Sequence, residues 1–308
     1  MPRPVPTTQT GSLTDNQHGT NDTLVLGTGT SPSDLGVVIH GDALAMYDDS
    51  RGGNDTLVGG ANAYNGLFGD AHFMYDNTDG GNDTLIGGVG SINFLNGDVL
   101  TMYDTARGGN DRLIGGDGAV FNFFLADASD MYGNTRGGND TLIGGANTNN
   151  LMFGDTFNMH DNARGGNDTL IGGAVSINSL FGDALDMRDN ARGGDDTIIS
   201  GAGTDRMVGD AVFINGVAAS PTAPTGSVVT GADTFVFAPG NGEDFVSDFR
   251  QSDHDRIDVS AWGFQSLADM TIVDAGVDTR IEFDAANSVT LSGFADPGLL
   301  QASDFIFA

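Results

Sequence analysis

A ten-residue unit recurs along this chain at a nearly constant step. It reads Arg-Gly-Gly-Asn-Asp-Thr-Leu-Ile-Gly-Gly at 164–173, and the same aspartate marks each full copy. The marker residues are Asp55, Asp83, Asp111, Asp140, Asp168 and Asp196, evenly spaced except for one extra residue between Asp111 and Asp140, and a degenerate copy ends at Asp22. A period of about 28 residues is typical of a solenoid, in which each coil buries its apolar face on its neighbours. The sequence therefore predicts an all-β, right-handed parallel β-roll or β-helix of about seven coils.

Four further columns of residues keep the same step. The residue two places after the marker is always aliphatic: Leu24, Leu57, Leu85, Leu113, Leu142, Leu170 and Ile198. A second apolar ladder consists of Leu67, Leu95, Phe124, Met152, Leu180 and Met207. An asparagine column, which parallel coils would stack amide on amide, contains Asn65, Asn93, Asn122, Asn150 and Asn178. A methionine column suited to filling a core contains Met46, Met74, Met102, Met131, Met159 and Met187.

These columns predict three short strands in each coil, separated by turns rich in Gly, Asn and Asp. The repeats occupy residues 19–215. A Pro- and Thr-rich segment at 1–18 reads as an N-terminal arm, and 216–226 reads as a loop. Residues 227–308 alternate apolar and polar positions in strand-like runs, which predicts a β-rich C-terminal cap.

The net charge of the chain argues against two classes of partner. It has 42 acidic residues, all aspartate except Glu243 and Glu282, against 12 basic residues, and its net charge is −30. This charge would repel nucleic acids and anionic membranes, so we expect neither as a partner. No stretch is long and apolar enough to span a membrane, so we expect no membrane insertion. The chain has no cysteine, which excludes disulfides and thiolate metal sites.

A second aspartate column follows the first by half a repeat, at Asp70, Asp98, Asp127, Asp155, Asp183 and Asp210. Parallel coils would bring neighbouring carboxylates of either column within roughly 5 Å, where each pair costs on the order of 1 to 3 kcal/mol. The coils therefore need a counterion. Calcium accepts 6 to 8 oxygen ligands in flexible geometry. The expected ligands are the two columns together with carbonyls of the turn glycines Gly53, Gly81, Gly109, Gly138, Gly166 and Gly194. The sequence thus predicts several calcium ions and folding that depends on them.

The repeat resembles the nonapeptide Gly-Gly-x-Gly-x-Asp-x-apolar-x of the repeats-in-toxin (RTX) calcium-binding proteins. With Asp168 at the sixth position, the neighbours Gly166, Asn167, Thr169 and Leu170 match, whereas Ala163 and Arg164 stand in the first two positions. The C-terminal motifs around Asp233 and Asp244 are similar to the terminal domain of type I secretion substrates, and the ending Ser-Asp-Phe-Ile-Phe-Ala is similar to their uncleaved export signal. The resemblance implies secretion through the type I machinery, folding on extracellular calcium, and Asp233 and Asp244 as further ligands.

The role of the folded protein is left open between two classes. The five histidines have no zinc-ligand spacing and no nucleophile motif is present, so we expect no enzyme. The first hypothesis is a structural protein that assembles with itself into a filament, surface layer or matrix, because solenoid ends expose unpaired strands. The alternative is a monomeric adhesin or polysaccharide-binding module. An arginine column, which either binds an anionic polysaccharide or neutralises nearby Asp, contains Arg51, Arg107, Arg136, Arg164 and Arg192, with Asp79 replacing one member.

Overall fold

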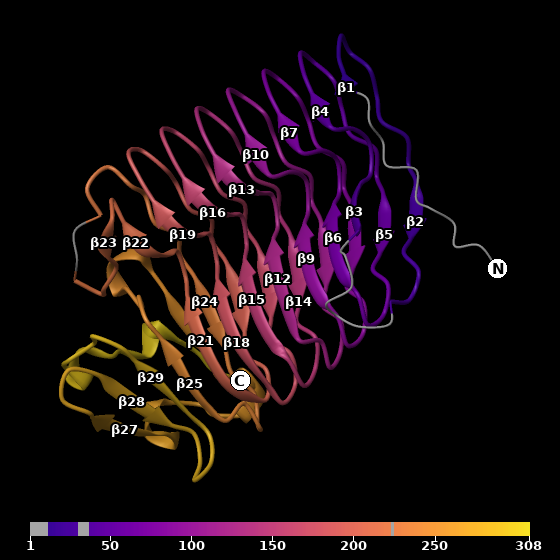
Figure 1. Cartoon of the computed structure of the whole chain (residues 1–308). Helices are drawn as coiled ribbons and strands as arrows, with labels where there is room; N and C mark the ends of the chain where they lie inside the picture. Colours follow the sequence, from indigo (N-terminus) through magenta and orange to yellow (C-terminus); the bar gives the residue numbers. More distant parts are fainter. Residues whose placement is uncertain (1–11, 30–36, 223–224) are drawn as a thin grey trace.

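The chain winds into a solenoid whose coils stack along one axis (Figure 1). The computed structural model describes residues 12–29, 37–222 and 225–308. Each full coil contributes one short strand to each of three sheets, and equivalent residues of successive coils pair in parallel, as Leu85 pairs with Leu113. The described residues contain no α-helix and five short 3-10 helices, all after residue 250. The predicted all-β parallel solenoid with three strands per coil is therefore confirmed.

The first sheet, here called the Leu sheet, contains the Thr-Leu-Ile segments. Leu57, Leu85 and their equivalents are fully buried, whereas the Thr and Ile on either side face outward. Its ten strands are, in order, β2 (Thr23–Val25), β5 (Thr56–Val58), β8 (Thr84–Ile86), β11 (Arg112–Ile114), β14 (Thr141–Ile143), β17 (Thr169–Ile171), β20 (Thr197–Ile199), β24 (Thr234–Val236), β26 (Arg256–Asp258) and β30 (Phe305–Ile306).

The second sheet, the Asn sheet, contains the asparagine column. Each amide donates to the next across the stack, as Asn65 Nδ2 does to Asn93 Oδ1 at 2.8 Å, so the predicted amide ladder is confirmed. Its eleven strands are, in order, β3 (Val37–His40), β6 (Tyr64–Phe68), β9 (Ile92–Asn96), β12 (Phe121–Leu125), β15 (Asn149–Phe153), β18 (Ser176–Phe181), β21 (Gly203–Val208), β25 (Glu243–Val246), β29 (Ser288–Leu291), β28 (Thr279–Glu282) and β27 (Thr271–Asp274).

The third sheet, the Met sheet, contains the methionine column, whose members are buried. Its nine strands are, in order, β1 (Ser12–Leu13), β4 (Ala45–Met46), β7 (Phe73–Met74), β10 (Thr101–Met102), β13 (Ala128–Met131), β16 (Thr156–Met159), β19 (Ala184–Met187), β22 (Ala211–Ile214) and β23 (Val217–Ala218). After most Met-sheet strands the chain turns through a residue with positive φ, such as Asp76 at 58° and Asp104 at 59°, a conformation that Asp, Asn and Gly adopt most readily.

The coil is divided into two lobes, each with its own core. The larger core lies between the Leu and Asn sheets and runs from Leu26 to Phe305. The smaller core lies behind the Met sheet and is built from its methionines with small residues such as Ala71 and Ala106. A third, smaller apolar cluster of Leu125, Phe153, Phe181 and Val208 packs with Phe157 and Leu185, and so joins strands of the Asn and Met sheets.

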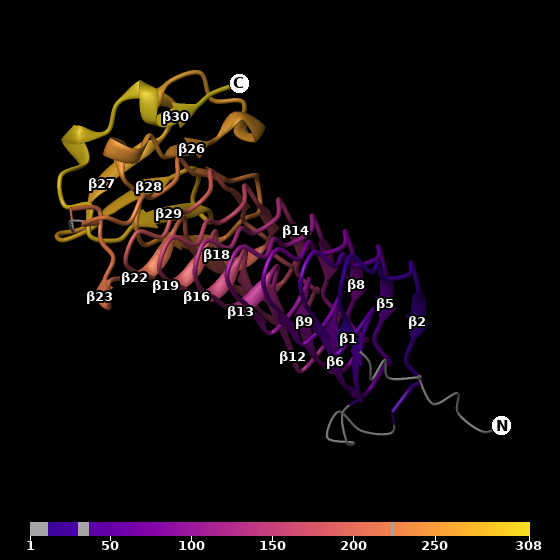
Figure 2. The ribbon, with the colours of Figure 1, turned by 90° about the horizontal axis from the view of Figure 1, so that it is seen from above.

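In the structure, the expected arm, loop and cap are parts of the same stack of strands. Residues 12–18 of the expected arm belong to the first coil, since β1 pairs with β4 and His18 bridges Arg51; residues 1–11 lie outside the described part. The expected loop at 216–226 contains β23, which pairs antiparallel with β22. The cap continues the Leu and Asn sheets and shares the larger core, so only the Met sheet stops there. Figure 2 shows the cap strands β26 to β30 at one end of the stack.

Candidate metal centre

Two corners of every coil meet between the lobes and form a strip that we call the waist. One corner is the pair, mostly Gly-Asp, that follows the Asn-sheet strands of the repeats, and the other is the segment, mostly Gly-Gly-Asn-Asp, that precedes their Leu-sheet strands. A hydrogen bond joins them across eleven residues: the N–H of Gly81 donates to Asp70 Oδ2 at 2.9 Å, and that of Gly138 donates to Asp127 Oδ1 at 2.8 Å. Both predicted aspartate columns therefore line one continuous strip.

The first column forms a ladder between backbone and side chain. The N–H of Asp55 donates to Oδ1 of Asp83 at 2.6 Å, and the N–H of Asp140 donates to Oδ1 of Asp168 at 2.7 Å. The ladder starts at Asp22, whose N–H donates to Asp55, and continues through Asp196 to Asp233. The structure thus brings together all seven predicted members of this column, and it adds Asp233 in register.

The second oxygen of these carboxyl groups has no partner. Ten buried Oδ2 atoms of the waist lack a hydrogen bond, namely those of Asp55, Asp83, Asp111, Asp127, Asp140, Asp155, Asp168, Asp183, Asp196 and Asp233. A buried carboxylate oxygen without a donor or cation costs several kcal/mol, on the order of a buried unpaired charge. Ten in one strip would unfold an ordinary domain, so each must hold a proton or a cation.

The second column is packed side chain against side chain. The carboxyl groups of Asp70 and Asp98 approach each other beside Gly80, and those of Asp127 and Asp155 beside Gly137, so that a Cβ built at either glycine would overlap an oxygen of both. An ionised carboxylate only accepts hydrogen bonds, so two of them in contact need a proton or a cation between them. All six predicted members, Asp70 to Asp210, are buried in this row.

The two columns act on one another. Burial raises the pKa of Asp111 well above its usual range, and the neighbouring charges of Asp83 and Asp127 raise it further. The pKa of Asp183 is raised by burial and then by Asp196 and Asp155. For Asp55, near the N-terminal end, burial raises the pKa to about 7. The carboxyl groups of the waist therefore hold protons more tightly than exposed carboxyl groups do.

The turn glycines face this strip through their N–H groups. Gly53 donates to Asp42, Gly109 to Asp98, Gly166 to Asp155 and Gly194 to Asp183. We expected these glycines, with Gly81 and Gly138, to offer carbonyl oxygens to calcium. A donated N–H is not a metal ligand, and the expected role of the carbonyl oxygens stays a prediction.

Sequence reasoning missed three members of the columns. Asp42 begins the second column; its Gly41-Asp42 pair stands one repeat before Asp70, so extending the period backward would have found it. Asp248 ends that column and accepts from the N–H groups of Gly209 and Asp210. Asp255 ends the first column and accepts from Asp233 N–H. The last two lie beyond the periodic region, where spacing carries no signal.

Asp244, an expected calcium ligand, lies elsewhere. It is on β25 of the Asn sheet, where its Oδ1 accepts from the N–H of Asp205 at 3.0 Å and its Oδ2 accepts from Asn241 Nδ2 at 2.7 Å. Asp205 in turn accepts from Asn178, so both acids extend the asparagine column. Burial raises the pKa of Asp244 to about 7. Its place in the ladder separates it from the waist, and the expectation that it joins the metal site is corrected.

A buried arginine stands where the two columns end. Arg250 has 4% of its side chain exposed and is the only buried arginine among the described residues. Its charge lowers the pKa of Asp248, which burial otherwise raises, and its Nη1 lies 3.8 Å from Asp253 Oδ2. Its backbone N–H donates to Asp255 Oδ2 at 2.7 Å. The C-terminal end of the waist thus contains a cation supplied by the chain itself.

The carboxyl groups of the waist form a row along the stack and not a closed coordination sphere. Within residues 12–29, 37–222 and 225–308, no three Asp, Glu or His side chains form a cluster with the geometry of a metal site. The residues fit calcium through charge and orphaned oxygens, with carboxyl groups of successive coils as donors.

Comparisons with protein-family models, with curated proteins and with solved structures give no match to this chain. None of the helices in the described part is long and apolar enough to cross a membrane.

Proposed function

We propose that the waist binds several calcium ions and that this binding lets the coils stack at neutral pH. The observation that carries the proposal is the set of ten buried Oδ2 atoms without partners. Among the described residues, the only buried basic side chains are those of Arg250 and of His40, which lies on β3 of the Asn sheet. The chain has no lysine. Carboxylate oxygen is the donor that calcium prefers.

The first column and the facing members of the second would hold the ions. Asp111, Asp127 and Asp140 show how the two columns act on each other: burial raises the pKa of Asp111 and of Asp140, and the charge of Asp127 raises both further. A divalent cation bound there would supply the positive charge that the packed carboxylates lack. Calcium suits a row of unequal donors better than magnesium, which requires a near-ideal octahedron and retains its waters.

Protons are the competing occupant of the waist, and a titration separates the two. At pH 8 we expect little β-structure by circular dichroism in a chelator and full β-structure in millimolar calcium, with calcium uptake measured by calorimetry. Magnesium at the same concentration should restore less. Equal β content with and without calcium at pH 8 would refute calcium-dependent folding.

A matched pair of variants tests the site itself. Asp111→Asn with Asp140→Asn replaces two waist carboxylates by amides of the same shape, as the asparagine column already does in this fold. We expect lower calcium uptake and a smaller calcium requirement for folding. Asp104→Asn with Asp161→Asn removes the same charge from exposed turns and should leave calcium uptake unchanged.

We further propose that the protein is a secreted structural protein without catalytic activity, exported by the type I machinery and assembling with itself. The C-terminal motifs support export. In the described part of the chain, strand pairing on the N-terminal side stops at β1, β2 and β3, and Val25, Val37 and Val38 are exposed there, which supports association through that end. Electron microscopy with added calcium tests assembly: ordered particles joined at this end support it, whereas dispersed monomers exclude it.

A further inference from the structure

Three of the five members of the arginine column form no ion pair with an acidic residue of the described part. Arg51 and Arg107 contact Asp79, at 3.4 and 3.9 Å. The next three members, Arg136, Arg164 and Arg192, bridge one another in register, are exposed, and form no ion pair with any described residue. In a chain of net charge −30, three adjacent guanidinium groups without an acid partner need a reason.

A second row runs beside the arginines, two residues earlier in each coil. Asn162 Nδ2 donates to Asn134 Oδ1 at 3.2 Å, and Asn190 Nδ2 donates to Asn162 Oδ1 at 3.3 Å, so these exposed amides are held in a line. Three consecutive coils thus present the same Asn-x-Arg pattern. We call the strip formed by Asn134, Asn162, Asn190, Arg136, Arg164 and Arg192 the Asn–Arg groove.

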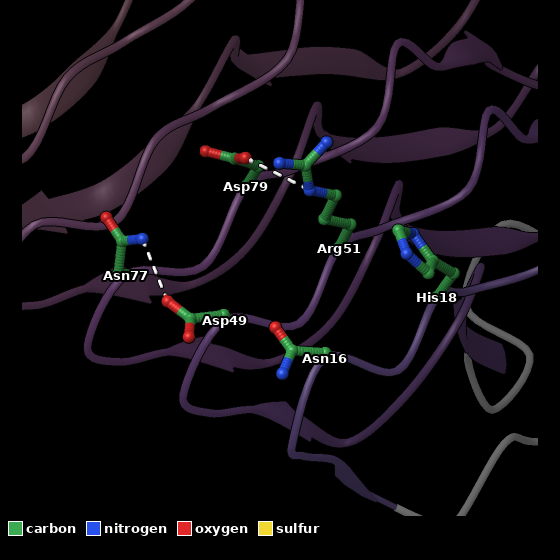
Figure 3. A pocket seen from close by; sticks show the side chains of 6 residues that line it. All are labelled: Asn16, His18, Asp49, Arg51, Asn77 and Asp79. Atoms are coloured by element: carbon green, nitrogen blue, oxygen red, sulfur yellow. Dashed lines mark hydrogen bonds and ion pairs between the residues drawn. The ribbon is translucent and has the colours of Figure 1, made fainter.

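At the N-terminal end of the stack, the equivalent positions of the first coils line a recess. Figure 3 shows Asn16, Asp49 and Asn77 on one side and His18, Arg51 and Asp79 on the other. The recess has a volume of about 350 Å³. There, Asp79 pairs with Arg51 and Asp49 accepts from Asn77. The Asn–Arg groove has the same two positions but neither of those carboxylates, so its charge is positive.

We propose that the Asn–Arg groove binds a linear acidic polysaccharide, with one anionic ring facing each coil. Guanidinium groups bind carboxylate or sulfate through paired hydrogen bonds, and amides bind hydroxyl groups. The arginines recur at the strand spacing of about 4.8 Å. That step is close to the length of one ring in an extended sugar chain, and it differs from the phosphate step of about 3.4 Å along one strand of duplex DNA.

The acids beside the groove are already engaged. Asp161 Oδ2 accepts from the N–H of Gly133 at 2.9 Å, and Asp189 Oδ2 accepts from the N–H of Asp161 at 3.2 Å. They point along the stack toward the preceding coil, and the guanidinium groups form no ion pair with them. The site requires the stacked coils, so at neutral pH it rests on the proposed calcium-dependent stacking, but its own side chains are not those of the waist.

The test uses the full chain in a fixed calcium concentration, with polygalacturonate and heparin fragments of defined length as probes. The triple variant Arg136→Gln, Arg164→Gln and Arg192→Gln should weaken binding at least about tenfold, because three adjacent contacts are lost. The matched control Arg112→Gln, Arg206→Gln and Arg256→Gln removes three exposed arginines outside the row and should change binding less than about twofold. Fragments shorter than three charged rings should bind more weakly.

Several results would overturn the proposal. Equal loss in both triple variants would show a general charge effect, and unchanged binding in the first would show that calcium bridges the polymer to acidic turns. Binding of single-stranded DNA as tight as that of the glycans would assign the row to another polyanion. Absence of binding to both probes would remove the site. Polygalacturonate and heparin distinguish carboxylate from sulfate, and circular dichroism confirms that each variant is folded.

Discussion

Gly137 is one of the waist glycines that leave no room for a side chain. A Cβ built there would overlap carboxyl oxygens of both Asp127 and Asp155. Gly137→Ala should therefore destabilise the calcium-bound protein by about 1 to 3 kcal/mol, since two carboxyl groups must shift. Urea unfolding measures the change. Gly66→Ala is the control, because a Cβ built there would meet a Val38 methyl group at 3.0 Å and no carboxyl group, and the equivalent residues in the next coils are Phe94 and Phe123. A Gly137→Ala protein as stable as the control would contradict the packing of the waist.

Buried carboxyl groups give the metal-free protein an unusual dependence on pH. The pKa values of Asp55 and Asp244 are both raised by burial to about 7. A carboxyl group with a higher pKa in the folded state binds its proton more tightly when folded. Its contribution to stability is therefore fully present below about pH 4 and is lost as the pH rises through the folded value.

In a chelator we therefore expect the melting temperature to fall between pH 4 and pH 8, and calcium to restore it mainly at the upper end. Differential scanning calorimetry across this range measures both effects. Asp→Asn replacement at position 55 should reduce the slope. A melting temperature that rises with pH in the chelator would show that these groups are not protonated in the folded protein.

At the scale of the element, the asparagine ladder holds the corner between the Leu and Asn sheets. Asn122 Oδ1 accepts from Asn93 and from the N–H of Gly116, and its Nδ2 donates to Asn150 and to the Gly116 carbonyl. Asn122→Ala leaves these buried groups unsatisfied and should cost at least about 3 kcal/mol. Chemical unfolding measures it. Asn122→Asp should cost at least as much at neutral pH, because an ionised carboxylate cannot donate to Asn150 Oδ1 or to the Gly116 carbonyl. Unchanged stability in either variant would contradict this account.

Arg250 closes the waist at the cap. Arg250→Met removes the only buried guanidinium of the described residues and leaves Asp248 and Asp253 without its charge, which should cost about 3 to 5 kcal/mol in low calcium. The calcium concentration needed for half-folding, followed by circular dichroism, should rise. Arg280→Met is the control, since its partners Glu243 and Glu282 are exposed and the pairs contribute less than about 1 kcal/mol each. An unchanged midpoint would show that Arg250 does not act on the waist.

The repeat of about 28 residues predicted the strands and columns that recur in every coil. It did not predict how separate parts of a coil pack against one another. Leu57, Asn65 and Met46 could be placed correctly because a coil returns each to the same height, so spacing alone determines their neighbours. The waist could not be predicted, because it depends on how two separate corners of the coil fold onto one another. Asp244 was grouped with the waist aspartates because its motif resembles the repeat. In the structure it lies on β25, in line with the asparagine column.

At the scale of the whole molecule, the solenoid is one-dimensional, and its length should be adjustable by whole coils. Deleting 141–168 removes one complete repeat and joins Asp140 to Thr169, which restores the pattern. We expect this protein to fold with the same β content per residue and to bind less calcium. Deleting 141–154 removes half a coil and should prevent cooperative folding. Circular dichroism and calcium titration compare the two; equal behaviour would contradict the stacking of coils.

The Leu and Asn sheets run without interruption from the coils into the cap. Strands β24 and β25 therefore offer ready-made edges on which β20 and β21 can form, and Arg250 gives this end a positive charge that needs no outside supply. A growing stack has a template only where such an edge already exists. We therefore expect the solenoid to fold in one direction, from the C-terminal strands back toward the first coil.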